Sequence, residues 1–449
     1  MKLIGFTTAL LVIGAAGGLW LSGLINNEHQ NAALPVPPEP PRLSQAPEYA
    51  RCLDLLLADP AGARGFARDW YMQGGGEGAA QCEALAQLSL GEPDFDTPQH
   101  IKDAAIKAIN DNWSHYTPVA GFLDLREAVC TKLKRDNNLD YTPDQIITST
   151  GAKQSLANAL LALVDEGDEV IIPTPYWVTY SELVKIARGK VVEIRTTVEA
   201  GFKATPAQIE AAITPKTKVF MFSSPCNPSG AVYSKAELEA LANLFKKYPH
   251  ITILSDEIYE YINFIGKHES IAQFSEIKDQ VIVINGLSKG FAMTGWRLGY
   301  TASNITLAKA MEKLQGQFTS GTCSITQKAA VAALVGDLKP SIAMTEEFTR
   351  RRTTTLALVN AMPGFKCFAP EGAFYVFPDV SSYYGKSDGQ QTIKNASDLS
   401  MFLLNTAHVS SVMGDAFGEP HCVRFSFANS MENIEKAWAR IREALATLK

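Results

Sequence analysis

Along most of the chain, apolar residues follow one of two patterns: short continuous runs, as in buried strands, or a repeat of three to four residues, as in helices. Short runs rich in valine and isoleucine alternate with longer stretches whose apolar positions recur every three or four residues. Such runs, separated by helices, are typical of a mainly parallel sheet that is buried on both faces. The runs expected to form strands are QIITST (145–150), EVIIP (169–173), KVVEIRT (190–196), KVFMFSS (218–224), ITILSD (251–256) and VIVING (281–286). The pattern predicts an α/β body, and it predicts that the helix after residue 150 is closed by Gly167.

The pattern changes near residue 340. A long helical stretch at 342–362 is followed by the apolar segments 372–380 and 421–428, and a last amphipathic stretch covers 431–448. We therefore expect a large domain over residues 88–340 and a smaller α+β domain over residues 341–449.

The first 87 residues follow neither pattern. Residues 3–25 contain no charge and are long enough for a helix that crosses a bilayer, so residues 1–26 are predicted to be a transmembrane anchor or a signal segment. A proline-rich stretch at 34–47 predicts an extended linker. Residues 48–87 have a helical pattern with a weak likeness to one tetratricopeptide hairpin.

Composition narrows the classes of function. The chain has 449 residues, of which 46% are hydrophobic and 20% charged, as in a globular protein. Its net charge of −6 and the absence of a basic block argue against a nucleic-acid partner. The seven cysteines form no C-x-x-C pair, so we expect reduced thiols and no metal site.

Polar residues gather where the predicted strands end. Gly151, Ala152 and Lys153 follow the first strand, and Asn227 follows the fourth. Asp256 ends the fifth strand, and the sixth leads to Ser288 and Lys289. Ligands of open α/β sheets bind outside the carboxyl ends of the strands, so one pocket is expected to receive all of these residues.

Each of these residues has an ordinary interpretation beside a functional one. Gly151 and Ala152 form either a plain strand-to-helix turn or a phosphate site at a helix N-terminus. Arg297 suits a surface ion pair or a phosphate clamp, and Asp256 suits a helix cap or the partner of a positive ring nitrogen. Lys289 is either a solvated side chain or a nucleophile with a lowered pKa. Together they match what pyridoxal phosphate requires.

At this point a family resemblance adds to the pattern. Residues 88–449 resemble the class I pyridoxal-phosphate aminotransferases of fold type I, and within them the bacterial aspartate aminotransferase subgroup. That fold has a mainly parallel seven-stranded sheet in its large domain. The matching stretches are SLGEPDFDTP (89–98), YTPVAGFLDLREAV (116–129), GAKQ (151–154), PYWVTY (175–180), SSPCNPSGAVY (223–233), SDEIYE (255–260), SKGFAMTGWRLGY (288–300), EGAFYVFPD (371–379) and VRFSFA (423–428).

The resemblance implies roles for individual residues. Lys289 corresponds to the lysine that binds the cofactor covalently, Asp256 pairs with its ring nitrogen, and Tyr259 completes the catalytic set. Asn227 and Tyr259 are implied to bind the ring oxygen, while Trp177 stacks on the ring. Gly151, Ala152 and Lys153 are implied to line the phosphate cup, and Arg297 is implied to bind the phosphate. Ser288 is implied to be a further cofactor contact. Tyr116 is implied to reach the phosphate of a partner subunit across a homodimer interface. Substrate contacts are implied for Gly91, Trp177, Asn227 and Arg424, with Arg424 gripping the α-carboxylate.

The resemblance also implies an activity. It predicts a transaminase that moves an amino group from an L-amino acid, foremost aspartate, to 2-oxoglutarate by a ping-pong mechanism. Aromatic amino acids, prephenate and other 2-amino acids are alternative substrates, and a lyase or synthase of the same fold is a further alternative. The predicted partners are amino acids, 2-oxo acids and a second copy of the chain, in the cytoplasm.

Residues 1–87 depart from the family pattern. They show no counterpart of the family's N-terminal arm, which packs on the partner subunit and helps to close the site. We interpret them as the product of a fused or mis-joined gene. The alternatives are a genuine aminotransferase anchored by a single membrane pass through residues 3–25, and a catalytically impaired, membrane-tethered fusion protein.

Overall fold

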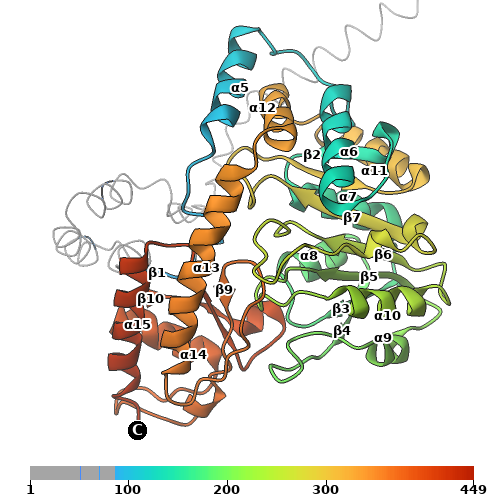
Figure 1. The fold of residues 1–449 in the computed structure, drawn as a ribbon. Coiled ribbons are helices and arrows are strands. Elements are labelled where there is room, and N and C mark those ends of the chain that lie inside the picture. The colour runs from blue at the N-terminus through green and yellow to red at the C-terminus, as the bar shows by residue number, and fades with distance from the viewer. Residues whose placement is uncertain (1–50, 52–69, 71–85, 90) are drawn as a thin grey trace, which may run out of the picture.

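The computed structural model describes residues 86–89 and 91–449, together with Arg51 and Trp70 (Figure 1). The predicted membrane segment, the proline-rich linker and nearly all of the predicted repeat-like segment lie outside the described residues. Among the described residues, no helix combines the length and apolar character needed to cross a membrane. The membrane and localisation hypotheses therefore stay predictions.

A seven-stranded sheet forms the centre of the larger part, in the order β2-β8-β7-β6-β5-β3-β4. Four of its strand pairs are parallel, whereas β8 pairs antiparallel with both β2 and β7. This mainly parallel sheet confirms the predicted fold class. The strands are β2 (Ile146–Ser149), β3 (Glu169–Pro173), β4 (Lys190–Ile194), β5 (Thr217–Ser223), β6 (Thr252–Asp256), β7 (Val281–Gly286) and β8 (Gly299–Ala302).

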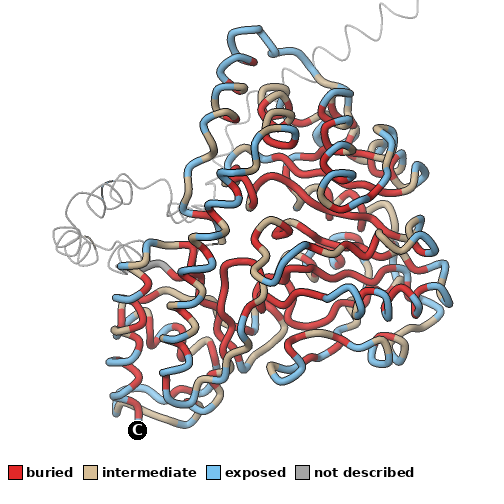
Figure 2. Tube along the Cα trace, in the orientation of Figure 1, coloured by how far each residue is buried: buried red, intermediate tan, exposed pale blue. Residues whose placement is uncertain are grey.

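Helices cover both faces of this sheet (Figure 1). In the large part they are α5 (Gln99–Asn110), α6 (Leu123–Asn137), α7 (Ala152–Leu163), α8 (Thr179–Ile186), α9 (Pro206–Ala212), α10 (Lys235–Phe245), α11 (Ile305–Phe318) and α12 (Ser324–Val335). In β5, Val219 and Met221 pack with α7, α8 and α11, whereas Phe220 and Phe222 pack with α6, α10 and α12. This period of two explains the continuous burial of the central strands (Figure 2).

Two local predictions need correction. The helix after residue 150 ends at Leu163, because Val164 is already extended, and Gly167 instead shapes the turn into β3. The run 190–196 is an edge strand that is not buried on both faces, since Lys190 and Glu193 are exposed. Charged side chains on an edge strand protect its free backbone from pairing with other chains.

A smaller α+β part follows, with its own core. It contains the three-stranded antiparallel sheet β11-β12-β9 and a second apolar cluster around Phe348, Phe402 and Trp438. Its elements are α13 (Lys339–Asn360), β9 (Tyr375–Val376), α14 (Ala396–Phe402), β10 (Val409–Ser410), β11 (Val412–Met413), β12 (Val423–Ser426) and α15 (Met431–Leu445). Helix α13 runs between the two parts (Figure 1), and it packs against α15. The domain boundary near residue 340 stays a proposal, which the two separate cores support.

The end of the segment predicted to be helical, residues 86–87, is a strand instead. Residues Ala86–Gln87 form strand β1, which pairs in parallel with β10 of the smaller part. Alanine and glutamine favour helices, but the unpaired edge of β10 offers backbone hydrogen bonds that outweigh this preference. Leu88 continues into the core of the smaller part. The chain therefore enters the body along the C-terminal part before it reaches the large sheet.

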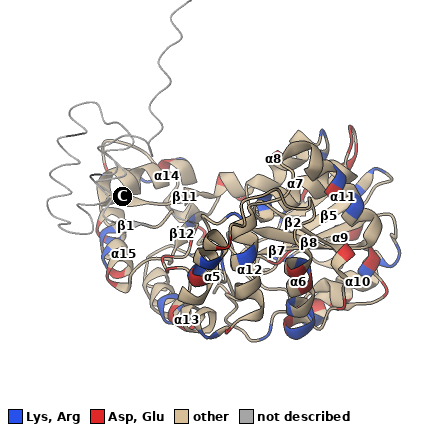
Figure 3. Cartoon of the chain, turned by 90° about the horizontal axis from the view of Figure 1, so that it is seen from above, with Lys and Arg blue, Asp and Glu red and all other residues tan. Residues whose placement is uncertain are grey.

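Charged residues of both signs occur on the outer helices, for example on α6 and α10 (Figure 3). Many of them pair locally, as Lys107 does with Asp111 and Lys436 with Glu432. Exposed pairs of this kind add little to stability, so they mark a solvated surface.

Candidate active site

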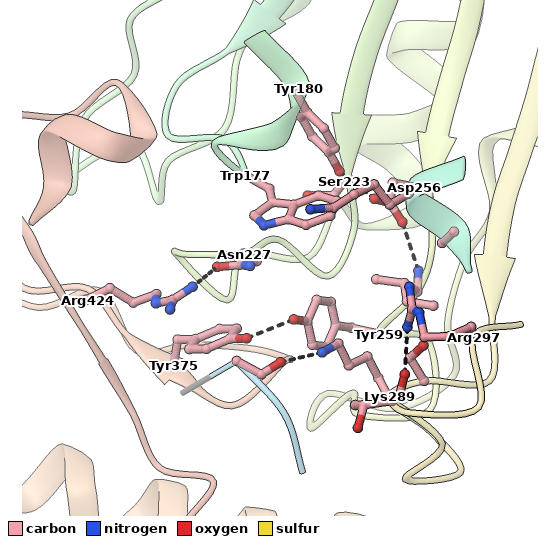
Figure 4. A pocket seen from close by; sticks show the side chains of 16 residues that line it. Trp177, Tyr180, Ser223, Asn227, Asp256, Tyr259, Lys289, Arg297, Tyr375 and Arg424 are labelled. Carbon is pink, nitrogen blue, oxygen red and sulfur yellow. Dashed lines mark hydrogen bonds between the residues drawn. The ribbon is translucent and has the colours of Figure 1, made fainter. Parts of the chain in front are cut away.

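A cavity of about 270 Å³ lies at the carboxyl ends of β5, β6 and β7 and reaches the smaller part (Figure 4). Eleven of the predicted site residues line it: Gly91, Ala152, Lys153, Trp177, Asn227, Asp256, Tyr259, Ser288, Lys289, Arg297 and Arg424. Apart from Gly151, the polar residues that follow the predicted strands thus surround a single space. Gly151 adjoins it through Arg297, whereas Tyr116 lies outside it and is 98% exposed.

Lys289 lies three residues after β7, in the turn that leads toward β8. Its Nζ donates a hydrogen bond to the carbonyl oxygen of Gly91. Burial is the main cause that lowers the pKa of this lysine to about 8. The nearby charges of Arg424 and Arg297 act in the same direction, and those of Glu92 and Asp256 oppose them. About a tenth of such lysines carry a free amine at pH 7, far more than for an ordinary lysine. The side chain is therefore suited to act as a nucleophile.

Asp256 is the last residue of β6, and its carboxylate is almost fully buried. The Tyr180 hydroxyl donates to Oδ2 at 2.6 Å, and the backbone N–H of Ile258 donates to Oδ1 at 3.2 Å. Burial raises the pKa of this carboxyl to about 6 although both hydrogen bonds oppose the shift. A cation placed beside it would restore the charged form, because opposite charges at short range stabilise each other.

The other end of the cavity is built to hold an anion. Gly151 caps the N-terminus of α7 with a φ of 84°, and Ala152 begins that helix. The guanidinium of Arg297 lies so close to Gly151 that a Cβ at this position would overlap it. Its Nη1 donates to the carbonyl oxygen of Thr294 at 2.6 Å, which fixes the side chain. Free N–H groups of a helix start and a guanidinium together favour a phosphate.

Arg424 comes from β12 and reaches the cavity from the smaller part (Figure 4). Its Nη1 donates to Asn227 Oδ1 at 2.9 Å, and its Nη2 donates to the carbonyl oxygen of Ser89 at 2.8 Å. Its Nε is buried and has no hydrogen-bond partner in the described part of the chain. An unsatisfied buried donor is costly, so this group is suited to receive a carboxylate oxygen.

Aromatic side chains form the walls between these charged groups. The Trp177 ring meets Tyr180 edge-on at 5.9 Å, and Lys153 Nζ lies 4.9 Å from its centroid. The hydroxyls of Tyr259 and Tyr375 are 2.9 Å apart. The cavity thus offers flat apolar faces, a buried acid, an amine and two guanidiniums. These features fit the ring, aldehyde and phosphate of pyridoxal phosphate, and they also fit a substrate carboxylate.

Five lining residues were not predicted: Tyr180, Ser223, Ile258, Thr294 and Tyr375. All five lie inside stretches that carry the family resemblance, which was the available signal. A motif gives the neighbourhood of a site, but it does not tell which of its side chains turn toward the cavity.

Comparison with known proteins agrees with this chemistry. A family profile described as "Aminotransferase class I and II" matches residues 84–441. The chain is 45% identical over 371 residues to an aspartate/prephenate aminotransferase of Nitrosomonas europaea, covering 82% of this chain and 94% of that protein. A bifunctional aspartate aminotransferase and glutamate/aspartate-prephenate aminotransferase of Petunia hybrida is 44% identical over 372 residues, covering 81% of this chain and 77% of that protein. The crystal structure of an aspartate aminotransferase from Rhizobium meliloti superposes with a TM-score of 0.81 at 40% identity, covering 87% of this chain and 96% of that one.

Proposed function

The chain belongs to the class I and II aminotransferases, and we propose that within this family it transfers the amino group of aspartate to 2-oxoglutarate. It is a transferase that uses pyridoxal phosphate. The observation that carries the proposal is one cavity that holds a half-buried amine, a buried acid and two guanidiniums. When bound, the cofactor supplies an aldehyde that condenses with amines and a ring that accepts the electrons of a breaking Cα–H bond.

We assign the cofactor contacts from these side chains. Lys289 Nζ is the covalent attachment point, and Asp256 holds a proton on the ring nitrogen by its negative charge. Tyr259 and Asn227 orient the ring through its oxygen, and Trp177 covers one face. Arg297 and the start of α7 bind the phosphate, together with Ser288.

The proton chemistry then falls to Lys289. When it is not attached to the cofactor, the Nζ of Lys289 would lie in the same cavity as the substrate. It takes the proton from the substrate Cα as a general base and returns it as a general acid. Its pKa of about 8 suits both roles near neutral pH, because neither form is strongly disfavoured.

The preference for a dicarboxylic substrate rests on the distribution of positive charge. Four cationic side chains line the cavity: Lys153, Lys289, Arg297 and Arg424. Three of them have roles in covalent binding, phosphate binding and α-carboxylate binding. We propose that Lys153, held over the Trp177 ring and implied by the resemblance to adjoin the phosphate cup, also attracts the second carboxylate. The names of the relatives, which include aspartate and prephenate, support acidic substrates.

A panel of amino donors tests this proposal. The holoenzyme should convert aspartate and glutamate faster than alanine or phenylalanine, with 2-oxoglutarate or prephenate as acceptor. Lys153→Met should raise KM for aspartate about tenfold, as expected for one charge-assisted hydrogen bond, and change KM for alanine little. Lys185→Met, an exposed lysine of α8 paired with Glu182, serves as the matched control. Equal turnover of all donors, or an unchanged KM for aspartate in Lys153→Met, would contradict the dicarboxylate assignment.

Arg424→Lys should weaken binding of donor and 2-oxo acid together. Lysine keeps the charge but loses the planar fork that meets both carboxylate oxygens, so each affinity should fall roughly 10- to 100-fold. Titration of the loaded enzyme with an unreactive dicarboxylate measures the loss without turnover. Arg350→Lys, on the exposed side of α13, should bind the dicarboxylate normally. Unchanged affinity in Arg424→Lys would place the carboxylate elsewhere.

We also propose a homodimer. Tyr116 is almost fully exposed, and Ile106 and Ile109 of α5 are more than half exposed beside it in the chain. A partner subunit that covered these apolar side chains would also bring its own Tyr116 toward the phosphate end of this cavity, as the family resemblance implies.

A further inference from the structure

Tyr375 contacts three parts of the cavity at once (Figure 4). It lies in β9, where it pairs with Ser426 of β12, and it is fully buried. Its hydroxyl lies 2.9 Å from that of Tyr259. Its ring lies beneath the guanidinium of Arg424, at 4.5 Å from Cζ to the centroid. The backbone of Gly91 also packs closely against Tyr375, since a Cβ at Gly91 would lie 3.2 Å from the Tyr375 hydroxyl.

Each hydroxyl of the Tyr259–Tyr375 pair has one proton, so each can donate only one hydrogen bond. Burial raises the pKa of Tyr259 well above its usual value and also raises the pKa of Tyr375, so both are neutral and each carries a single donor. Without a ligand, either oxygen can be the donor of the 2.9 Å bond. If Tyr259 donates its hydroxyl proton to the ring oxygen of the cofactor, it cannot also donate that proton to Tyr375. The bond between the two tyrosines then persists only with Tyr375 as the donor.

We propose that Tyr375 is a positioning residue that donates a hydrogen bond to Tyr259 and thereby sets the proton affinity of Lys289 Nζ in the loaded enzyme. This inference rests on the proposed role of Tyr259 toward the cofactor's ring oxygen. A donor on the Tyr259 oxygen strengthens its O–H as a donor, because hydrogen bonds in a chain polarise one another. The negative charge of the ring oxygen would then be better stabilised by Tyr259. That oxygen would therefore be a weaker hydrogen-bond acceptor for the protonated, cofactor-linked Nζ and would stabilise its proton less. That proton is lost at a lower pH as a result.

Other charges act on the same nitrogen, and the test must leave them in place. Asp256, Glu92, Arg297 and Arg424 all act on Lys289. Tyr375→Phe removes the hydroxyl but keeps the ring under Arg424, so these charges keep their positions. Tyr375→Leu removes the ring as well, so it separates the hydroxyl's effect from that of the ring.

The experiment is a pH titration of the visible absorbance of the holoenzyme, whose midpoint reports proton loss from the linked Lys289 Nζ. Tyr375→Phe should raise this midpoint by about half a pH unit, roughly a threefold change in the proton equilibrium. Tyr259→Phe should raise it further, and adding Tyr375→Phe to that variant should change nothing more, because the relay passes through Tyr259. Binding of an unreactive dicarboxylate should be unchanged in Tyr375→Phe and about threefold to tenfold weaker in Tyr375→Leu.

Tyr383→Phe is the matched control. Tyr383 is also buried in the core of the smaller part, and its hydroxyl donates to the carbonyl oxygen of Pro363 at 2.6 Å. It should leave the midpoint where it is. Should Tyr375→Phe not fold, 3,5-difluorotyrosine at position 375 keeps the shape, makes a stronger donor and should lower the midpoint.

The outcomes distinguish the proposed role of Tyr259 toward the ring oxygen from the relay that runs from Tyr375 through Tyr259. An unmoved midpoint in Tyr259→Phe would overturn the role of Tyr259 and the relay with it. A shift in Tyr259→Phe without a shift in Tyr375→Phe, or a further shift in the double variant, would overturn the relay alone. An unmoved or raised midpoint with difluorotyrosine would also overturn it.

Discussion

Lys289→Ala should abolish covalent attachment of pyridoxal phosphate and lower transamination by more than about 10⁴-fold, because we assign to this one side chain both the attachment point and the proton transfer. The proposed phosphate site should persist, since Arg297 and the start of α7 do not depend on the lysine. Borohydride reduction followed by intact mass should find the cofactor fixed to the native chain and absent from the variant. Circular dichroism should show an unchanged fold.

Lys153→Ala is the matched control for this experiment. It removes a second lysine from the wall of the same cavity, yet the cofactor should still be fixed to the chain after reduction. Peptide mapping of the native enzyme should place the modified residue at Lys289. Fixation at another lysine in the Lys289→Ala variant would assign the covalent link to that residue.

Asp256→Ala should leave the cofactor bound but slow the half-reaction with aspartate by about 10²- to 10⁴-fold. Asp256 is the one acidic residue among those that line the cavity, and we assign it to hold a proton on the ring nitrogen. Without that proton the ring accepts electrons from the Cα–H bond poorly. Stopped-flow absorbance on mixing with aspartate measures the step directly.

Two comparisons isolate the charge of Asp256 from its structural role. Tyr180→Phe removes the hydrogen bond to Oδ2 but keeps the carboxylate, so its rate should fall far less. A cofactor analogue whose ring nitrogen is permanently methylated should restore much of the rate to Asp256→Ala. Near-native rates in Asp256→Ala with the ordinary cofactor would remove Asp256 from this role.

Local sequence pattern was sufficient for the larger elements. Buried strands such as 281–286 read clearly, because both faces of a parallel sheet require apolar side chains. Their ends also located the cavity, since the carboxyl ends of parallel strands share one edge of the sheet. The pattern failed at element ends and at the sheet's edge. Val164 ends α7 early, and 190–194 is an exposed edge strand, because tertiary neighbours decide both.

The sequence by itself determined the fold class and the cofactor family, and it supplied the residues that we propose to carry the chemistry, since Lys289, Asp256, Arg297 and Arg424 lie in recognisable stretches. Only the tertiary structure decided how these groups act. It made residues 86–87 a strand that pairs with β10, and it brought Tyr375 to Tyr259 across 116 positions of sequence. It also left Nε of Arg424 without a hydrogen-bond partner among the described residues. It also buried Lys289 enough to lower its pKa to about 8. Burial and long-range contacts are properties of packing, and no local pattern of residues contains them.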